Sequence, residues 1–208
     1  MHGTVTRLWP RFLALSLLVA LTGARTSHAA TTWKDVDALV SEQKFEAAAT
    51  EVQKLRQRAQ KAGDETEWAK ALIREVQLRG GLHGYETAVR FLHEQPWPKG
   101  ALPRTALLLF EASGLVTYSQ AYGWEIGKRE RVAANTSTDL KTWTLDQIFA
   151  AATRAYVEIW KGREALGTEK VEKFGDYLEA NNYPREIRGT LRDAVSYVFV
   201  DLLANTQG

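Results

Sequence analysis

Cysteine is absent from this chain, and proline and histidine are scarce. The sequence of 208 residues contains no Cys, 5 Pro and 4 His. Without cysteine the protein has no disulfide, no thiolate zinc site, no cysteine nucleophile and no cysteine-linked lipid. Hydrophobic residues nevertheless make up 45% of the chain and include 7 Trp, 7 Tyr and 7 Phe, which excludes a wholly disordered protein. We therefore expect a globular protein with one domain or two small ones.

Residues 1–29 have the layout of a secretory signal peptide. Arg7 and Arg11 precede an apolar run, Phe12–Leu21, which is too short to cross a bilayer as a stable helix. Small residues follow and end at Ala29, after which we predict cleavage. We therefore expect a periplasmic or secreted protein that is not a lipoprotein. The alternative is an uncleaved N-terminal anchor.

Charge is nearly balanced once this leader is set aside. Three of the 27 Lys and Arg residues lie in residues 1–29 and no acid does, which leaves 24 basic against 25 acidic residues. A nucleic-acid interface needs a basic face. The densest basic cluster shares its segment with acids and is interpreted as a solvated helix face; it consists of Lys54, Arg56, Arg58 and Lys61. We expect no nucleic-acid partner, and no membrane contact beyond the signal peptide.

Residues 30–98 show helical periodicity. Apolar side chains recur every three or four residues in four stretches, which are Trp33–Val40, Phe45–Ala59, Trp68–Val76 and Tyr85–Leu92. Gly63 is a natural helix stop, and we expect Gly80, Gly81 and Gly84 to break the third helix. The pattern predicts two antiparallel helical hairpins of about the size of a tetratricopeptide-like unit, without a clear repeated motif.

Residues 99–208 are expected to add further helices to the same domain. The first begins near Pro103, runs to about Tyr122 and is apolar on most sides, which predicts a central position. A polar loop follows at about 123–142. Thr144 then caps the next helix, with a glutamine in the capping-box position.

The C-terminal part is also predicted to be helical. The segment Thr168–Tyr183 is interpreted as a short helical or irregular piece. The last helix is expected to carry Ile187, Leu191, Val195, Val198 and Leu202 at helical spacing. No alternating strand pattern is present. The predicted fold is all-α: stacked antiparallel helical hairpins, tetratricopeptide-like but degenerate, preceded by a signal peptide.

Few residues suit catalysis or metal binding. His83 and His93 lie ten residues apart and neither belongs to a His-Glu-x-x-His pattern, so we expect no zinc hydrolase site. Carboxylate pairs such as Asp64 with Glu67 have the spacing of helix caps. The sequence therefore predicts no catalytic, cofactor-binding or metal-binding residue, and a protein that is not an enzyme.

Two ordered groups of residues are more specific than a helical fold requires. They follow a Tyr- and Gln-containing helix end and comprise Trp124, Asp139, Thr142 and Trp143, and later Thr190, Leu191 and Asp193. These motifs resemble the N-terminal helical region of the large bacterial alpha-2-macroglobulin-like proteins. The resemblance covers roughly residues 33 to 206.

The resemblance implies an exported protein connected with protease inhibition. Members of that family trap attacking proteases with β-sandwich macroglobulin domains, a bait region and, in many members, a Cys-Gln thioester. This chain has no Cys and no β-sandwich pattern, so it is similar only to the leading helical module or to a truncated copy. The implied partners are downstream macroglobulin-type domains or envelope proteins, and proteases through the full-length protein. No inhibitory residue carries over.

The motif residues also have a structural interpretation. Trp143 stands in the hydrophobic-staple position before a helix cap, and Asp193 suits the positive end of the last helix. Asp139 suits a loop cap or an ion pair with Arg129 or Arg131. We favour structural roles over ligand contacts for these three residues.

Two functions remain open. The first is a non-catalytic helical module of an alpha-2-macroglobulin-like protein, which predicts an exposed apolar patch where other domains sit. The second is a free-standing periplasmic helical-repeat scaffold that binds peptides or proteins, which predicts a concave face lined by Trp, Tyr and Asn side chains.

Overall fold

The computed structural model describes residues 31–129, 139–175, 177, 186–187 and 189–205. The described residues, which all follow the predicted signal peptide, belong to one compact unit. They form eight α-helices and two short 3₁₀ turns, and their only β pairing is an isolated bridge between Lys170 and Thr190. The all-α prediction is confirmed. The predicted signal peptide lies outside the described residues.

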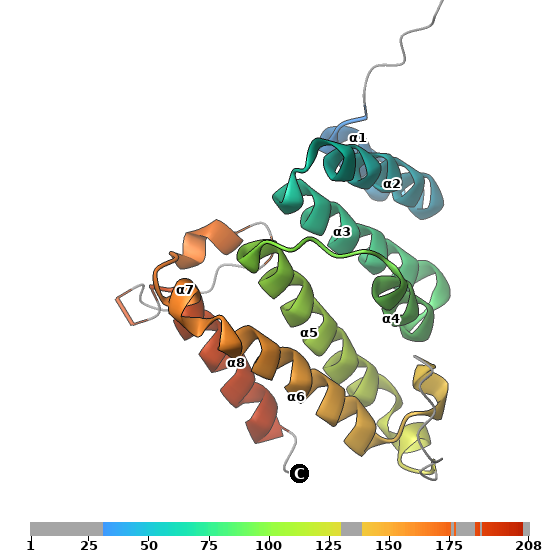
Figure 1. Cartoon of the computed structure of the whole chain (residues 1–208). Helices are drawn as coiled ribbons and strands as arrows, with labels where there is room; N and C mark the ends of the chain where they lie inside the picture. The colour runs from blue at the N-terminus through green and yellow to red at the C-terminus, as the bar shows by residue number, and fades with distance from the viewer. Residues whose placement is uncertain (1–30, 130–138, 176, 178–185, 188, 206–208) are drawn as a thin grey trace, which may run out of the picture. The chain divides into compact units, whose positions relative to one another are not determined.

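Three antiparallel hairpins follow one another along the chain (Figure 1). The first two are α1–α2 and α3–α4, with bounds Trp33–Ser41, Phe45–Ala62, Glu65–His83 and Tyr85–Glu94. The third pairs the longest helix, α5 (Ala101–Ile126), with α6 (Leu145–Lys161). Because α4 and an extended link return the chain, α3 and α5 run parallel (Figure 1).

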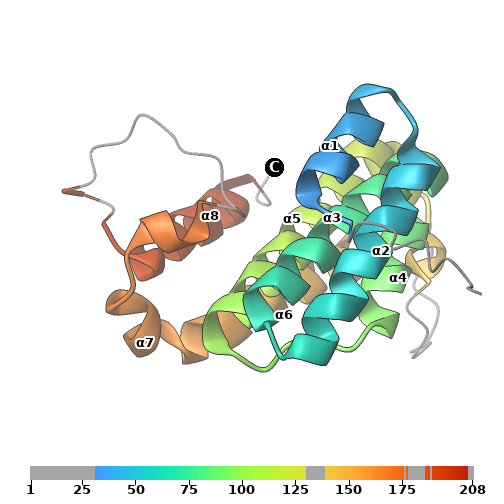
Figure 2. The ribbon, with the colours of Figure 1, turned by 90° about the horizontal axis from the view of Figure 1, so that it is seen from above.

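The C-terminal part packs against the third hairpin. It contains a short helix α7 (Arg163–Gly167), the turn η2 (Val171–Phe174) and the helix α8 (Leu191–Asn205), while η1 (Leu140–Thr142) precedes α6. Seen from above, α8 lies on one side of α5 and α1 lies on the other (Figure 2). None of the helices formed by the described residues has the length and apolar character needed to cross a bilayer.

Helix ends follow the expected local chemistry at most positions. Gly63 stops α2 with φ +70, and the Asp64 carboxylate caps α3 by accepting the Glu67 N–H at 3.0 Å. Thr144 caps α6 in a capping box with Gln147. The predicted caps at Asp64 and Thr144 are therefore confirmed.

The predicted break at Gly80 and Gly81 is wrong. The α3 helix continues through both glycines to His83 and ends at Gly84, whose φ is +87. A glycine inside a helix weakens it by only about 1 kcal/mol, and the side chains of α3 that pack on α2, α4 and α5 outweigh that loss. Only the left-handed position, Gly84, needs glycine for its backbone geometry.

Two other predicted boundaries differ from the structure. The α5 helix runs to Ile126, so the polar connection begins about one turn later than position 123. The α8 helix begins at Leu191, and Ile187 lies in an exposed turn before it. Thr190 and Asp193 form the N-terminal hydrogen bonds that start α8 at that point.

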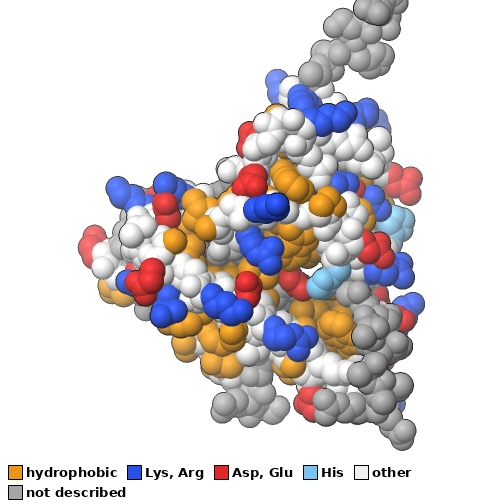
Figure 3. All heavy atoms as spheres, viewed as in Figure 1, with side chains coloured by type: hydrophobic (Ala, Val, Ile, Leu, Met, Phe, Trp, Pro, Cys, Tyr) orange, Lys and Arg blue, Asp and Glu red, His pale blue; other side chains and the backbone are white. Residues whose placement is uncertain are grey.

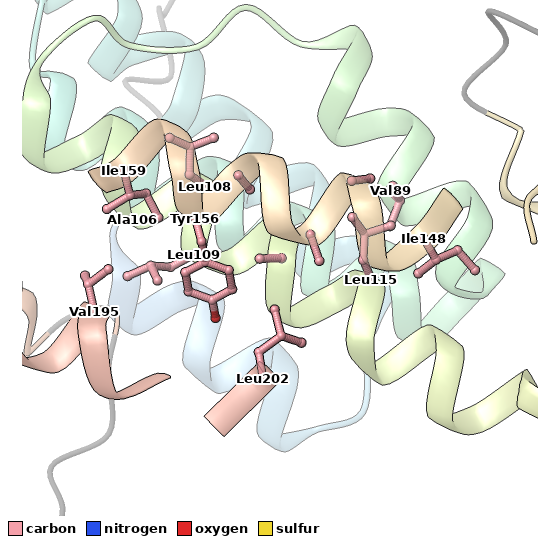
Figure 4. Packing of buried hydrophobic residues seen from close by; sticks show 14 of the residues in the cluster. Val89, Ala106, Leu108, Leu109, Leu115, Ile148, Tyr156, Ile159, Val195 and Leu202 are labelled. Atoms are coloured by element: carbon pink, nitrogen blue, oxygen red, sulfur yellow. The ribbon is translucent and has the colours of Figure 1, made fainter. Parts of the chain in front are cut away.

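The largest apolar core lies between α5, α6 and α8. Leu115 of α5 and Ile148 of α6 are fully buried in it, and the Tyr156 ring of α6 stacks on Phe199 of α8 with centroids 4.8 Å apart. Figure 4 shows the Tyr156 ring between Leu109 and Leu202 of α8. The third hairpin is thus the centre of the fold, as the apolar character of α5 predicts.

A buried ion cluster joins the first two hairpins and corrects the interpretation of Arg56 as solvated. The side chain of Arg56 is 8% exposed, and its Nε donates to the fully buried carboxylate of Glu75 at 2.8 Å. Arg79 donates to the other carboxylate oxygen at 2.9 Å. The remaining members of the predicted basic cluster, Lys54, Arg58 and Lys61, are exposed.

Candidate functional site

A hollow is lined by α1, α3 and α5, the first helices of the three hairpins. We call it the α3–α5 groove; its cavity volume is about 390 Å³. Its lining includes Trp33 and Asp37 of α1, Lys70, Ile73, Arg74 and Gln77 of α3, Ala106, Leu109, Phe110 and Ser113 of α5, and Phe174, Tyr177 and Val198 opposite them. The volume falls in the range of sites that bind small molecules or peptide side chains.

Hydrogen bonds fix two aromatic walls of this groove. The Trp33 indole N–H donates to the Glu67 carboxylate at 2.7 Å, which ties α1 to α3. The Tyr177 hydroxyl donates to the carbonyl oxygen of Thr66 at 2.9 Å, which ties Tyr177 to the start of α3. Both walls are therefore held against the same helix.

The charged side chains among the described lining residues come from α1 and α3. The Lys70 ammonium lies 5.0 Å from the centre of the Trp33 ring. The Arg74 guanidinium lies 3.9 Å from the Asp37 carboxylate, and both of these side chains are at least one third exposed. Lys70, Arg74 and Asp37 are the charged side chains among the described lining residues.

A second hollow adjoins the groove and shares Gln77, Phe110 and Ser113 with it. We call it the glycine hollow; it lies between α3, α4 and α5, has a cavity volume of about 350 Å³ and is lined chiefly by apolar and small residues. These include Gly80, Gly81, Gly114, Val89, Leu92 and Tyr85. The two hollows together follow α5 from Ala106 to Thr117.

Glycine is not needed at this hollow for close packing. A Cβ atom at Gly81 or Gly114 would meet no neighbouring atom within 4 Å, and one at Gly80 would make an ordinary contact with the Ala88 Cβ at 3.6 Å. These helical glycines have no positive φ. Their structural effect is to leave the space between α3, α4 and α5 unfilled.

A third, smaller hollow lies between α4, α5 and α6 and contains an ionisable pair. The His93 Nε2 atom lies 2.9 Å from the Glu111 carboxylate, which joins α4 to α5. Arg154 and Glu158 of α6 also line this hollow, whose volume is about 300 Å³. In the described part of the chain no three His, Asp or Glu side chains are placed to hold a metal ion.

Three of the motif residues lie together in the turn before α6. The Asp139 carboxylate accepts the Lys141 N–H at 3.1 Å, and the Thr142 hydroxyl donates to the Asp139 carbonyl at 2.9 Å. Trp143 is half-buried against the main core. These contacts shape the return of the chain into α6.

Arg129 clamps this turn to the end of α5. Its Nη1 atom donates to the carbonyl oxygens of Leu140 and Trp143 at 2.8 and 3.0 Å, and its Nη2 donates to the Tyr118 hydroxyl at 3.2 Å. Asp139 caps the turn, whereas Arg129 binds backbone carbonyls. Burial raises the pKa of Tyr118 above its ordinary value. Arg131 lies outside the described residues.

The other motif residues occupy separate places. Thr190 and Asp193 close a capping box at the start of α8, because the Asp193 carboxylate accepts the Thr190 N–H at 3.1 Å and the Thr190 hydroxyl oxygen accepts the Asp193 N–H at 3.2 Å. Leu191 is fully buried. Trp124 is 76% exposed, with the Lys128 ammonium 3.1 Å from its ring centre. The structure thus brings Asp139, Thr142 and Trp143 into one turn, and places none of the seven in the α3–α5 groove.

Comparison with protein-family models, with curated proteins and with solved structures finds no match for this chain. The resemblance to alpha-2-macroglobulin-like proteins therefore rests on the sequence motifs alone.

The sequence analysis does not predict that the groove residues form a site. Lys70 and Arg74 are spaced by one helical turn, and Gly80, Gly81 and Gly114 interrupt good helix formers. Unbroken helical periodicity on both sides of a glycine pair is the signal that could have marked a hollow between helices. Trp33 and Tyr177 are brought to the groove by tertiary packing, which has no local signature.

Proposed function

We propose that this chain is a non-catalytic, exported helical scaffold that binds a segment of a partner protein in the α3–α5 groove. The observation that carries the proposal is that α1, α3 and α5, the first helices of three successive hairpins, all contribute to one groove. Export rests on the predicted signal peptide.

Stacked helical hairpins favour this kind of function. Repetition of one unit aligns equivalent helices, and their shared face forms an extended surface that recognises peptides. Here that surface has an apolar floor from Leu109 and Phe110 and a second wall from Phe174, Tyr177 and Val198. Trp33 and Tyr177 are among the described residues that line it, together with the charged Lys70 and Arg74.

A peptide selection with a blocked groove tests the proposal. Random peptides of about twelve residues, long enough to exceed the groove along α5, are selected by display against the purified protein. Ser113→Trp fills the region that the two hollows share, and Ser113 is exposed enough for the helix to tolerate the change. Glu125→Trp, on the exposed far end of the same helix, is the matched control.

We expect selected peptides to bind the parent and the Glu125→Trp variant equally, and to lose at least tenfold in affinity for Ser113→Trp. Circular dichroism checks that both variants keep their helical content. Selected peptides that bind Ser113→Trp as well as the parent, or a selection that returns no peptide with saturable binding, would overturn the proposal.

A second candidate is the helical module of an alpha-2-macroglobulin-like protein. It is favoured by exposed apolar side chains on α6 and α8, which are Val157, Trp160, Tyr197, Val200 and Leu203. Hydrophobic side chains gather at the lower left of Figure 3, over these two helices. In this case the surface packs against macroglobulin-type domains.

The coding region downstream of Gly208 tests this second candidate. A reading frame that continues into β-sandwich sequence would support it. A well-supported stop codon at that point, together with a monomeric protein in which Val200→Glu leaves solubility and oligomeric state unchanged, would count against it.

A further inference from the structure

We infer that the glycine hollow is a binding site for a small, uncharged aromatic molecule that is free in solution. The hollow lies between α3, α4 and α5, and its cavity volume of about 350 Å³ is within the range of small-molecule sites. The inference goes beyond the proposed function, because it concerns a second ligand in a second hollow.

The floor of the hollow is part of the packed core. Ala88, Val89 and Leu92 of α4 line it at the spacing of one helix face, and each of these side chains is at most 4% exposed. The Trp97 indole N–H donates to the carbonyl oxygen of Leu92 at 2.9 Å, which holds the end of α4 in place. The floor is therefore fixed by the fold and is formed by apolar side chains.

The lining favours a ligand without charge. Among the described lining residues the charged side chain is Glu111, which is 11% exposed and lies 2.9 Å from the His93 Nε2 atom. An anionic ligand would leave water without a cation in this lining, and a cationic ligand would compete with His93 for Glu111. Burial of an unpaired charge is costly, whereas an apolar ligand gains free energy in proportion to its buried area.

Two aromatic side chains favour a flat ligand. Tyr85 and Phe110 line the hollow from α4 and α5, and the Tyr85 ring is held edge-to-face against Tyr122 with centroids 6.5 Å apart. Rings prefer stacked or edge-to-face contacts with other rings. Ser113 and Thr117 are exposed lining residues, and each offers a hydroxyl to one polar substituent of the ligand.

The volume determines the size of the ligand. A dry apolar cavity of about 150 Å³ holds one benzene molecule. On that scale the glycine hollow holds about two fused rings. A Cβ atom at Gly81 or Gly114 would meet no atom within 4 Å, so glycine at these positions lets a ring approach the backbone of α3 and α5.

An NMR titration with 2-naphthol, a neutral two-ring probe, tests the inference. We expect saturable binding to the purified protein with a dissociation constant of about 10–100 µM. The amide N–H signals of Gly80, Gly81 and Gly114 should be among those that shift most, because these residues line the hollow. Absence of saturable binding, or shifts centred on residues outside the hollow, would overturn the inference.

Two charged probes test the preference for a neutral ligand. The anion 2-naphthoate and the cation 2-naphthylmethylammonium keep the two rings and add a charge. Both should bind at least tenfold more weakly than 2-naphthol. Equal or tighter binding of either charged probe would overturn the claim that the ligand is uncharged.

Filling the hollow from the protein side gives a matched pair of variants. Gly114→Leu places a side chain in the open space and should weaken 2-naphthol at least tenfold. Gly123→Leu lies on the same helix, also meets no atom within 4 Å and does not line the hollow, so it should leave affinity unchanged. Both variants should unfold at or above the parent temperature, because leucine is the better helix former. Equal affinities of the two variants would overturn the inference.

The outcomes separate this inference from the proposed function. A selected peptide that binds while 2-naphthol does not would overturn the inference alone. Binding of 2-naphthol as described, with no peptide returned by the selection, would overturn the proposed function alone. Competitive displacement of 2-naphthol by a selected peptide would assign the hollow to the peptide and overturn the inference; simultaneous binding of both supports it.

Discussion

The Nε atom of Arg56 lies 2.8 Å from the Oε2 atom of Glu75, and both side chains are withdrawn from solvent. Arg79 donates to the same carboxylate, and the guanidinium groups of Arg56 and Arg79 lie 5.8 and 4.0 Å from the centre of the Phe91 ring. Side chains of α2 and α3 therefore meet at this carboxylate, and Phe91 of α4 packs on the two arginines that bind it. Two cations share it, and the aromatic face of Phe91 adds a further attractive surface.

Removing this carboxylate should destabilise the protein strongly. Glu75→Gln leaves two arginines without their counter-charge, and we expect a loss of about 3–5 kcal/mol in the free energy of unfolding, because an unpaired buried charge is costly. Urea unfolding measures the change. Glu46→Gln, on the exposed part of α2, is the control and should change stability by less than about 0.5 kcal/mol. Equal effects of the two variants would show that Glu75 has no special role.

The turn before α6 should depend on Arg129. Arg129→Ala removes donors from the carbonyl oxygens of Leu140 and Trp143, and we expect a loss of about 2 kcal/mol with faster hydrogen exchange at residues 139–144. Lys128→Ala, which removes only a contact with exposed Trp124, should leave that exchange unchanged. Uniformly faster exchange over the whole chain in Arg129→Ala would contradict a local clamp.

Alkaline pH should destabilise the core through Tyr156. Burial, with the nearby charge of Asp201, raises the pKa of Tyr156 from 10.0 to about 12. Because the unfolded chain releases this proton near pH 10 and the folded chain near pH 12, stability is lost as pH rises through that window. The loss is at most about 3 kcal/mol.

The control for this pH effect is a second tyrosine. Tyr156→Phe should flatten the fall of stability between pH 10 and 12, whereas Tyr197→Phe, on the exposed side of α8, should leave it unchanged. Denaturant unfolding across this pH range supplies the measurement. If the stability of Tyr156→Phe falls as steeply with pH as that of the parent, Tyr156 is not the cause of the alkaline destabilisation.

Two glycines should respond in opposite directions to alanine. Gly81→Ala meets no atom within 4 Å inside a helix and should raise stability by up to about 1 kcal/mol. Gly63→Ala places a Cβ at φ +70 and should lower it by about 1–2 kcal/mol. Thermal unfolding distinguishes them. A lower melting temperature for Gly81→Ala would contradict an unfilled hollow.

Local patterns in the sequence predict where the helices lie, but they do not predict which helices contact one another. Apolar periodicity predicts most of the helices. The caps at Asp64 and Thr144 can also be predicted, because capping depends on residues that are neighbours in the sequence. The burial of Arg56 could not be predicted from the sequence, because its partner Glu75 lies on another helix. The end of α5 at Ile126 and the start of α8 after Ile187 also depend on packing beyond the local pattern.

The groove was the least predictable feature. Trp33, Lys70 and Tyr177 are far apart in the chain, and the contacts of Trp33 and Tyr177 with α3 bring them together. Gly80 and Gly81 are conspicuous in the sequence, but the sequence analysis interprets them as a helix break and not as part of a hollow. The motif residues, by contrast, were visible in sequence because Asp139, Thr142 and Trp143 are close neighbours, as are Thr190 and Asp193.

The position of a bound peptide tests the central claim most directly. A photo-reactive benzoyl-phenylalanine at Phe110 lies between the two hollows, and one at Val157 lies on the exposed face of α6. Each protein is irradiated with a selected peptide, and the cross-linked peptide is identified by mass spectrometry. The account predicts cross-links from position 110 and none from position 157; cross-links from position 157 alone would contradict it.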